Sequence, residues 1–371
     1  NNLNKKSVVA IKLPNGIEYV KHIIALSTLC KVMPLANDAN LSNFEKFDYL
    51  LDKPITDRQI TNSTINNSRT FVMHTSGTTG HKRSINWTSS MVDYAVKKSS
   101  EGLKLCDKDV AFLGIPNYHG HAIITIILST WLTNGTIYCW DNTKPFTFWK
   151  EVEESKTTWV SASPSFYRNV LRLYKGQSQL SDLRFWRTGS EQLDRGTWER
   201  LRAFNKPVLE AYAGTEGTSF YCTPVYGEDG YTFNAIATPD PAILRIVDNE
   251  IQVTGPHVYV DDWYSPGDLG YIDESGKLYF TGRNSIVINS GGFKISPNER
   301  EAEIYNQYPQ IKECVVFAGP HNILGEVPYI LYTCEENLPI KYGKRVDKLI
   351  KTDTGKIYRN RDSLRKIWDA S

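Results

Sequence analysis

A run of Ser, Thr and Gly residues in the stretch FVMHTSGTTGHKRSINW, at 71–87, has the composition of an anion-binding loop. Glycines let a backbone turn and approach an anion closely, so that consecutive N–H groups can point inward. The hydroxyl side chains add donors, and Lys82 and Arg83 add positive charge. We therefore predict a strand that leads into a phosphate-binding loop, whose binding residues are Thr75, Ser76, Gly77, Thr78, Thr79 and Gly80.

The order of residues in this loop excludes a P-loop. A P-loop needs a glycine, four residues and then Gly-Lys-Ser or Gly-Lys-Thr, which does not occur here. By itself, the stretch has an equally good alternative interpretation as a solvated polar linker, because low-complexity Ser/Thr/Gly loops are common. Other segments of the chain have to decide between the two.

Three further segments place charged residues beside turns: EAYAGTEG at 210–217, WYSPGDLGYIDESGKLYFTGR at 263–283 and IKTDTGKIYR at 350–359. The Glu216 carboxylate is a hard oxygen ligand of the kind that Mg²⁺ prefers, and the Thr215 hydroxyl can bond a phosphate oxygen. The Asp268 carboxylate can accept two hydroxyl groups at once. Each segment alone is also explained by a strand end, a β-hairpin or an exposed lysine.

Taken together and in this order, the segments resemble the motifs of the adenylate-forming superfamily, which includes acyl-CoA synthetases, aryl-acid ligases, nonribosomal adenylation domains and luciferase. The glycine stretch resembles TSGTTGxPK, 210–217 resembles YGxTE, 263–283 resembles gWfrTGDlg…GR, and 350–359 resembles PKTxxGKIxR. The resemblance covers most of the chain up to Arg359. It implies roles for five more residues: Tyr212 beside adenine, Asp268 and Arg283 at the ribose, Glu216 at Mg²⁺, and Lys356 between the substrate carboxylate and the α-phosphate.

The segment IPNYHGH at 115–121 resembles the superfamily's PlfHv stretch, which implies that Tyr118 and His119 belong to the substrate pocket. His119 and His121 could alternatively be metal ligands, but two histidines in one loop with no third ligand nearby are weak evidence for a metal. A loop histidine bonded to backbone is a further alternative. Members that activate amino acids carry an aspartate in this region, and none is present here. The resemblance therefore implies a carboxylic acid without an α-amino group.

The segment GRNSIVINSGGFKISPNERE at 282–301 resembles the superfamily's hinge and the loop after it. The resemblance places the hinge at Ser285 and assigns Gly291 and Gly292 to the tunnel for the pantetheine thiol. Ser296, Pro297 and Glu299 predict a capped helix start. The connection from 332 to 351 is short where members usually have a helix and further strands, so we expect a shortened C-terminal domain.

The predicted function is that of an ATP-dependent acid:thiol ligase, which uses ATP and Mg²⁺ and passes its acyl group to CoA or to the 4′-phosphopantetheine of a carrier protein. A basic run in the shortened domain slightly favours an acidic carrier protein as the acceptor; it comprises Lys341, Lys344, Arg345, Lys348 and Lys351. A solvated charged loop explains that run about as well. The competing interpretation is a degenerate homologue that binds nucleotide or a carrier protein without turnover. The altered glycine loop, Pro266, Ser285 and the shortened C-terminal domain favour it.

These residues need a scaffold, and the hydrophobic pattern predicts one of α/β class. Up to Tyr212, short apolar runs at strand spacing alternate with helical patterns, which implies parallel βαβ units. From about 218 to 283 the pattern is strand-rich, and we expect SFYCTPV, YTFNAI, AILRIV, EIQVTG and KLYFTG to be strands of a β-rich subdomain. The predicted domains are a large one over 1–283 and a small, mobile α+β domain over 284–371 that carries the catalytic lysine.

The composition of the chain limits its size class, its partners and its cysteine chemistry. The chain has 371 residues, of which 40% are hydrophobic, enough for a sizeable core in two or three domains. With 43 Lys and Arg against 41 Asp and Glu, nothing suggests nucleic acid or a membrane surface as partner. The six cysteines include no CxxC pair, so neither a zinc site nor a disulfide scaffold is indicated. The apolar run at 122–132 is too short to span a bilayer, and the expected location is the cytoplasm.

Overall fold

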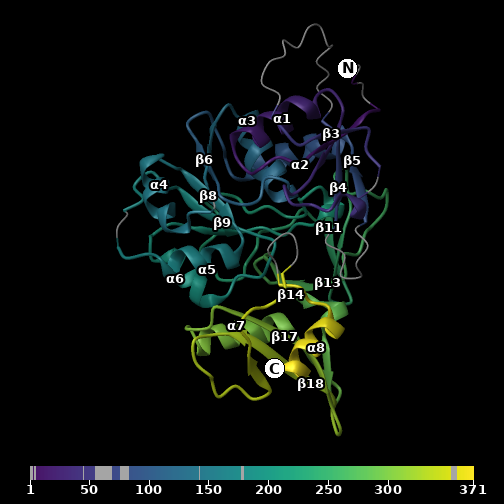
Figure 1. The fold of residues 1–371 in the computed structure, drawn as a ribbon, viewed down its shortest axis with the longest axis vertical. Coiled ribbons are helices and arrows are strands. Elements are labelled where there is room, and N and C mark those ends of the chain that lie inside the picture. Colours follow the sequence, from purple (N-terminus) through teal and green to yellow (C-terminus); the bar gives the residue numbers. More distant parts are fainter. Residues whose placement is uncertain are drawn as a thin grey trace.

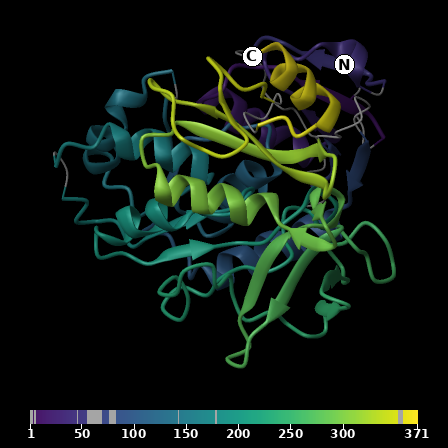
Figure 2. The same ribbon diagram turned by 90° about the horizontal axis from the view of Figure 1, so that it is seen from below.

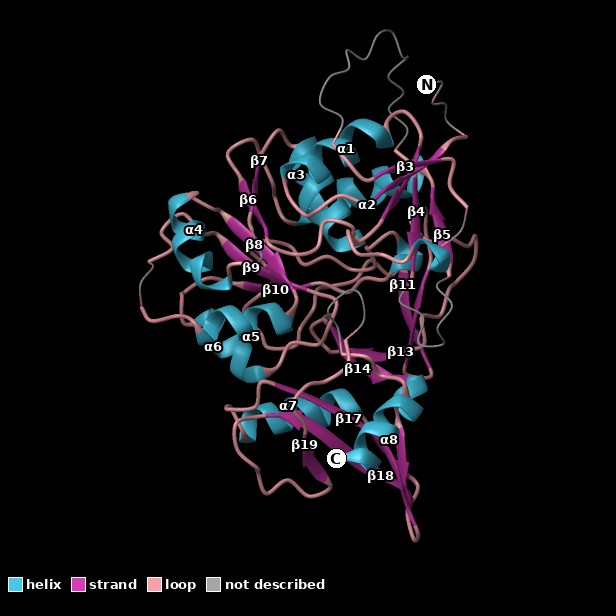
Figure 3. Cartoon of the chain, viewed as in Figure 1, coloured by secondary structure: helices cyan, strands magenta, loops and turns pink. Residues whose placement is uncertain are grey.

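The structure is a computed structural model of the chain, and it describes residues 3, 6–44, 46–54, 69–75, 83–141, 143–176, 179–351 and 357–371. Its elements fall into two parts along the long axis, an upper part that contains the N-terminus and a lower part that contains the C-terminus (Figure 1). Helices and strands alternate through much of the upper part (Figure 3). None of the helices within the described ranges is long and apolar enough to cross a membrane.

The first sheet has the strand order β3-β1-β2-β4-β5. Its strands are β1 (Val8–Ile11), β2 (Lys31–Pro34), β3 (Tyr49–Leu51), β4 (Phe71–His74) and β5 (Ser84–Trp87), and α1 (Ile17–Ser27), the short η1 (Leu41–Asn43) and α2 (Ser89–Gly102) accompany them. The first four strands are parallel, whereas β5 is antiparallel to β4. His74 at the end of β4 pairs with Ser84 at the start of β5.

The second sheet is entirely parallel, with the strand order β10-β9-β8-β6-β7. Its strands are β6 (Val110–Leu113), β7 (Thr136–Cys139), β8 (Trp159–Ala162), β9 (Phe185–Thr188) and β10 (Val208–Glu210). The segments between them form η2 (His121–Leu128), α3 (Ser129–Leu132), η3 (Pro145–Thr147), α4 (Phe148–Glu154), α5 (Pro164–Arg172) and α6 (Arg195–Arg202). The α/β class and the alternation of strands and helices predicted up to Tyr212 are confirmed.

The third sheet is antiparallel and follows the short turn η4 (Thr215–Gly217). It contains β11 (Leu244–Val247), β12 (Glu250–Val253), β13 (Asp268–Ile272) and β14 (Leu278–Arg283). The strand predictions for SFYCTPV and YTFNAI are wrong, because both segments are loops with only a single bridge, from Tyr212 to Cys222. Aromatic and β-branched residues indicate burial as much as pairing. Here Phe220 and Tyr221 are buried by side-chain packing without a sheet.

The lower part contains a fourth sheet with the order β16-β15-β18-β17 and β19 added beside β18. Its elements are η5 (Asn284–Ile286), β15 (Ile288–Ser290), β16 (Phe293–Ile295), α7 (Pro297–Gln307), β17 (Glu313–His321), β18 (Gly325–Thr333), β19 (Gly343–Arg345) and α8 (Arg361–Ala370). Seen from below, α7 and α8 lie along this sheet (Figure 2). The predicted start of α7 is confirmed, since the Ser296 side chain accepts a hydrogen bond from the Glu299 N–H at 3.4 Å.

The two parts touch through α7 and the strand before the predicted boundary. The Ser296 hydroxyl donates to the Thr281 carbonyl at 2.7 Å, and the Gly196 N–H donates to Asn306 Oδ1 at 3.3 Å. The Arg168 guanidinium lies 4.6 Å from the Tyr305 ring centre. Two hydrophobic clusters of the lower part are built only from residues after 287. A mobile domain that begins at 284 stays a prediction.

Candidate active site

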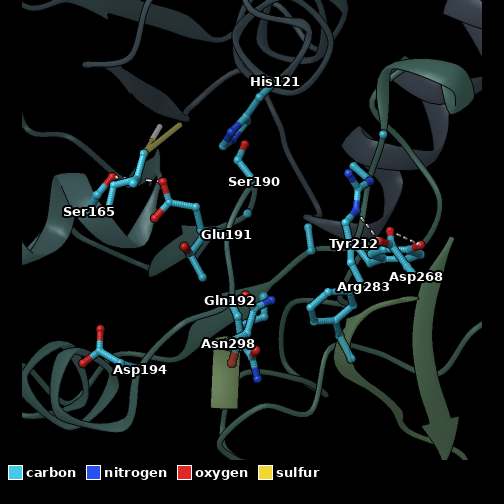
Figure 4. Close-up of a pocket in the computed structure, with 18 of the residues that line it drawn as sticks. His121, Ser165, Ser190, Glu191, Gln192, Asp194, Tyr212, Asp268, Arg283 and Asn298 are labelled. Atoms are coloured by element: carbon cyan, nitrogen blue, oxygen red, sulfur yellow. Dashed lines mark hydrogen bonds and ion pairs between the residues drawn. The ribbon is translucent and has the colours of Figure 1, made fainter. Parts of the chain in front are cut away.

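A cleft of about 580 Å³ lies where the second and third sheets meet α7. Its walls come from segments that are far apart in sequence: Thr75 after β4, His119 to His121 before and in η2, Arg187 to Gln192 after β9, Glu210 to Glu216, the pair Asp268 and Arg283, residues of α7, and Ile357 to Arg359. Figure 4 shows several of these side chains around one cavity. In open α/β sheets, ligands bind outside the carboxyl ends of the parallel strands, which is where this cleft begins.

One wall carries a hydrogen-bonded network of Tyr212, Asp268 and Arg283 (Figure 4). Asp268 begins β13 and Arg283 ends β14, and the antiparallel register places the two opposite each other. Arg283 Nε donates to Asp268 Oδ1 at 2.6 Å, and the Tyr212 hydroxyl donates to Asp268 Oδ2 at 2.8 Å. Burial, with the charge of Asp268, raises the pKa of Tyr212 well above its usual value. Tyr212 therefore stays protonated and keeps Asp268 oriented.

The turn that carries Thr215 and Glu216 is held by backbone contacts, so that both side chains line the cleft. The Trp87 indole N–H donates to the Thr215 carbonyl at 2.8 Å, and the Tyr259 N–H donates to the Glu216 carbonyl at 3.0 Å. A Cβ at Gly217 would lie 2.0 Å from the Tyr221 ring, so the turn needs glycine there. The departure at Ala213 leaves this packing intact, because Ala213 is exposed.

The predicted glycine loop reaches the cleft at its first residue. Thr75 lines the cleft, and its N–H donates to the Arg83 carbonyl at 2.9 Å, which joins the two ends of the loop. Arg83 itself donates to the Tyr259 hydroxyl at 2.6 Å, and that hydrogen bond raises the pKa of Arg83. The predictions for Ser76, Gly77, Thr78, Thr79 and Gly80 lie outside the described residues.

The two histidines of the IPNYHGH segment do different things. His119 lines the cleft and stacks on Tyr118 with ring centres 5.1 Å apart, whereas Tyr118 packs against the core and is not part of the lining. His121 Nε2 lies 2.7 Å from the Ser161 hydroxyl and 2.8 Å from Arg187 Nη1. Within the described part of the chain, no group of three His, Cys, Asp or Glu residues could hold a metal ion.

Lys356 lies outside the described residues, but the residues that follow it line the cleft. Arg359 forms two hydrogen bonds with Glu301 of α7, Nη1 to Oε1 at 2.7 Å and Nη2 to Oε2 at 2.5 Å. Burial alone would lower the pKa of Arg359, but the Glu301 carboxylate raises it above its usual value. This paired charge fixes the end of the predicted lysine motif beside the cleft.

Three other predicted residues are not in the cleft. Ser285 is exposed in η5, and Gly291 and Gly292 form the turn between β15 and β16, with φ of 58° and 90°. The assignments of a hinge and a thiol tunnel to them stay predictions.

Sequence reasoning missed two parts of the cleft, namely an arginine inside β9 and the turn that follows this strand. Ser190, Glu191 and Gln192 line the cleft between β9 and α6, and Asn298 faces them from α7 (Figure 4). Arg187 lies in β9 itself. The available signal was a charged residue inside the apolar strand FWRT, followed by a polar turn at the carboxyl end of a parallel strand.

Two α/β units, one with a mixed and one with a parallel sheet, stand with an antiparallel sheet and a small α+β part around one cleft, and this is the architecture of adenylate-forming enzymes. The sequence profile of the family described as AMP-binding enzyme matches residues 31–272. The chain belongs to that family.

Curated relatives include CoA ligases. A probable CoA ligase of Humulus lupulus is 30% identical over 77% of this chain, which spans 64% of that relative's length. An oxalate–CoA ligase of Saccharomyces cerevisiae and a 2-succinylbenzoate–CoA ligase of Listeria monocytogenes are each 26% identical over 97% of this chain and are covered over 78% and 82% of their lengths. The alignment with the yeast protein has 427 positions, so that protein carries segments that this shorter chain lacks.

Solved structures agree on the fold. The o-succinylbenzoate-CoA synthetase MenE of Bacillus subtilis, in complex with an acyl-adenylate, superposes with a TM-score of 0.81 at 20% identity over 98% of this chain and 89% of that one. ATP-bound MatB of Rhodopseudomonas palustris superposes with a TM-score of 0.80 at 19% identity over 99% and 90%.

Proposed function

We propose that the chain is an ATP-dependent ligase that activates a carboxylic acid as an acyl-adenylate and passes the acyl group to CoA. The observation that carries the proposal is that one cleft brings together Thr75, Glu216, Asp268 and the residues after Lys356, from four distant segments. Each belongs to a motif predicted from sequence for adenylate transfer. Chance would not gather all of them at one site.

In the first half-reaction, a carboxylate oxygen attacks the α-phosphorus of ATP. The new acyl–O–P bond forms as the bond from that phosphorus to the β-phosphate oxygen breaks, and pyrophosphate leaves. Tyr212, Asp268 and Arg283 bind the nucleoside, with Asp268 accepting the ribose hydroxyls. Lys356 offsets the negative charge that accumulates as carboxylate and phosphate approach each other.

Magnesium fits this site as a partner of the phosphates. Mg²⁺ in phosphoryl-transfer sites is usually bound by one or two carboxylates together with substrate oxygens. Glu216, half-buried in the lining, supplies such a carboxylate. When bound there, the ion would neutralise phosphate charge.

In the second half-reaction, a thiol attacks the acyl carbon, the carbon–oxygen bond to AMP breaks, and the thiol proton passes to solvent or base. CoA is the proposed acceptor because the relatives are named CoA ligases. The basic run that favoured a carrier protein is partly used within the chain: Lys351 pairs with Glu313 at 2.6 Å, and Lys344 donates to the Trp368 carbonyl at 2.7 Å.

The substrate is proposed to be an acid without an α-amino group. Neither the IPNYHGH segment nor the 19 residues after it, at 122–140, contain an aspartate to hold an ammonium. Oxalate and 2-succinylbenzoate, the acids in the relatives' names, likewise carry no amino group, and each has two carboxyl groups.

The test is pyrophosphate release from MgATP across aryl, alkyl and dicarboxylic acids, with acyl-AMP identified by mass spectrometry. CoA and a phosphopantetheinylated carrier protein are then supplied separately. We expect acid-dependent pyrophosphate release and thioester on CoA. Thioester on the carrier alone would correct the acceptor, and ATP binding without acid-dependent pyrophosphate release would favour a degenerate homologue.

A further inference from the structure

One wall of the cleft holds a buried positive charge that no carboxylate of the described residues balances. Arg187 is 2% exposed, lies in β9 after the buried Phe185 and Trp186, and lines the cleft. Burial lowers the pKa of Arg187 to about 10, so the guanidinium is still charged at neutral pH. No Asp or Glu within the described ranges pairs with it, although the neighbouring Arg184 pairs with Asp109 and Arg168 with Asp194.

Ser161 and His121 hold the Arg187 guanidinium in place. Ser161 of β8 stands opposite Arg187 in the parallel register, so both side chains lie on one face of the sheet. Arg187 Nη1 donates to the Ser161 hydroxyl at 3.1 Å and to His121 Nε2 at 2.8 Å. The Ser161 hydroxyl also lies 2.7 Å from His121 Nε2. A guanidinium can only donate, so His121 Nε2 accepts and its ring proton lies on Nδ1.

Two donors on this wall have no acceptor in the part of the chain that the structure describes. Arg187 Nε is buried and has no hydrogen-bond partner among the described residues. The same holds for the hydroxyl of Thr125, which lies one turn beyond His121 on η2 and lines the cleft. Buried polar groups are nearly always hydrogen-bonded in native proteins, so each exception needs an explanation. A ligand that brings oxygen acceptors and a negative charge would satisfy both.

Position separates this wall from the nucleotide network. His121 and Ser190 lie together on one side of the cavity, away from Tyr212, Asp268 and Arg283 (Figure 4). An acid that reacts at the α-phosphate has to extend from the nucleotide toward the remaining walls. The planar fork of an arginine matches a carboxylate, which two parallel N–H groups can bind together.

We propose that Arg187, held by Ser161 and His121, binds a second carboxylate of the acid, the one that is not activated, so that the preferred substrates are dicarboxylic acids. This inference rests on the proposed ligase function and specifies its substrate class. Arg187 is then the residue that determines specificity, and its charge has a counter-ion only when substrate is bound.

The first experiment uses the unmodified protein and acid pairs in which a methyl group replaces the second carboxylate: malonate with propionate, succinate with butyrate, glutarate with pentanoate, and phthalate with 2-methylbenzoate. Acid-dependent ATP–pyrophosphate exchange gives kcat/KM for each acid. We expect the best diacid to exceed its partner by roughly 100-fold or more, because a site built for a polar group rejects an analogue that lacks it.

The second experiment replaces the guanidinium. Arg187→Met should lower kcat/KM for the diacid by roughly 100-fold or more, with little change for the monoacid and in the KM for ATP. Arg187→Lys should recover part of the loss, since it restores the charge but not the fork. Arg245→Met removes a charge from β11 outside the cleft. It should change neither kcat/KM for the two acids nor the KM for ATP.

Several results would overturn the inference. If the unmodified protein activates monoacids as well as diacids, Arg187 does not select a second carboxylate, while the ligase function stands. If Arg187→Met raises the KM for ATP, the anion at Arg187 is a phosphate. If no acid supports exchange, the ligase function itself fails. The comparison of acids on the unmodified protein decides the matter even if Arg187→Met does not fold.

Discussion

The two walls of the cleft differ in how their buried charges are balanced. On the wall that we propose to bind the nucleotide, the Asp268 carboxylate, 6% exposed, receives hydrogen bonds from both Tyr212 and Arg283. On the other wall, the Arg187 guanidinium forms hydrogen bonds with the side chains of Ser161 and His121, and no carboxylate of the described residues pairs with it. A network that is satisfied without ligand is already in its binding geometry. A charge without a counter-ion instead makes the wall selective for the substrate that supplies one.

The largest expected effect lies outside both walls, at Lys356. We predict that Lys356→Ala lowers the rate of adenylation by at least roughly 100- to 1,000-fold, the usual loss when one preorganised charge-stabilising donor is removed from a transition state. ATP affinity should stay within a few-fold, because this lysine acts mainly in the transition state. Single-turnover pyrophosphate release and nucleotide titration measure the two quantities. Lys348→Ala is the control, and near-normal acid-dependent exchange in Lys356→Ala would remove the lysine from the mechanism.

The nucleotide wall should affect all acids alike. We predict that Asp268→Asn weakens ATP binding by roughly 10- to 100-fold, because it loses charged hydrogen bonds to Tyr212, Arg283 and the ribose. The fall in kcat/KM should be the same for diacids and monoacids, in contrast to Arg187→Met. Measurement of both acids of one pair in both variants is a direct comparison of the walls. A loss in Asp268→Asn that depends on the acid would show that the walls are not separate.

A smaller effect is expected at Glu216. We predict that Glu216→Gln raises the Mg²⁺ concentration needed for half-maximal pyrophosphate release by roughly 10-fold, as is usual when support for a bound metal is removed. The amide keeps the size of the side chain and loses its charge. Glu274→Gln, in the hairpin turn between β13 and β14, is the matched control. Identical magnesium titrations for Glu216→Gln and the unmodified protein would exclude Glu216 as a ligand.

The smallest expected effect is the pH dependence of the free energy of unfolding, and it comes from a histidine outside the cleft. His257 is fully buried, stacks on Tyr94 with ring centres 5.0 Å apart, and neither ring nitrogen has a hydrogen-bond partner among the described residues. Burial lowers the pKa of His257 to about 4. Because the unfolded chain binds this proton more readily, stability is lost as the pH falls from about 6.5 toward 4, and the full loss is roughly 3 kcal/mol.

Urea denaturation at pH 7 and pH 5 tests this prediction. His257→Phe keeps an aromatic ring against Tyr94 and cannot titrate, so its stability should depend less on pH than that of the unmodified protein. Equal pH dependence in the two proteins would contradict the burial of a neutral histidine.

Much of the fold could be predicted because local signals agreed with the final packing. In the parallel sheets, apolar runs such as VAFLGI and TTWVSA are separated by helical patterns and turn residues, so period and length identify each element. The same reasoning failed for SFYCTPV, because Tyr221 gains its burial by packing on Gly214 and Gly217. Sequence pattern reports that a side chain is buried, and does not report what covers it.

The two walls also differed in how far sequence could predict them. Asp268 and Arg283 stand in one recognisable segment and meet through one hairpin register. Arg187 meets His121 and Ser161, which are 66 and 26 residues away in the chain. Only the arrangement of β8, β9 and η2 brings those three together. A motif reveals residues that share a segment, whereas a specificity pocket assembled from several segments needs the fold.

The most direct test of acyl-adenylate formation follows one oxygen atom. The acid that performs best in pyrophosphate exchange is labelled with ¹⁸O in its carboxylates and incubated with MgATP and CoA, and the released AMP is analysed by mass spectrometry. Carboxylate attack on the α-phosphorus, followed by cleavage of the acyl carbon–oxygen bond, leaves one acid oxygen on AMP, and we predict AMP that carries a single ¹⁸O. Unlabelled AMP, or label in phosphate or pyrophosphate, would contradict the account.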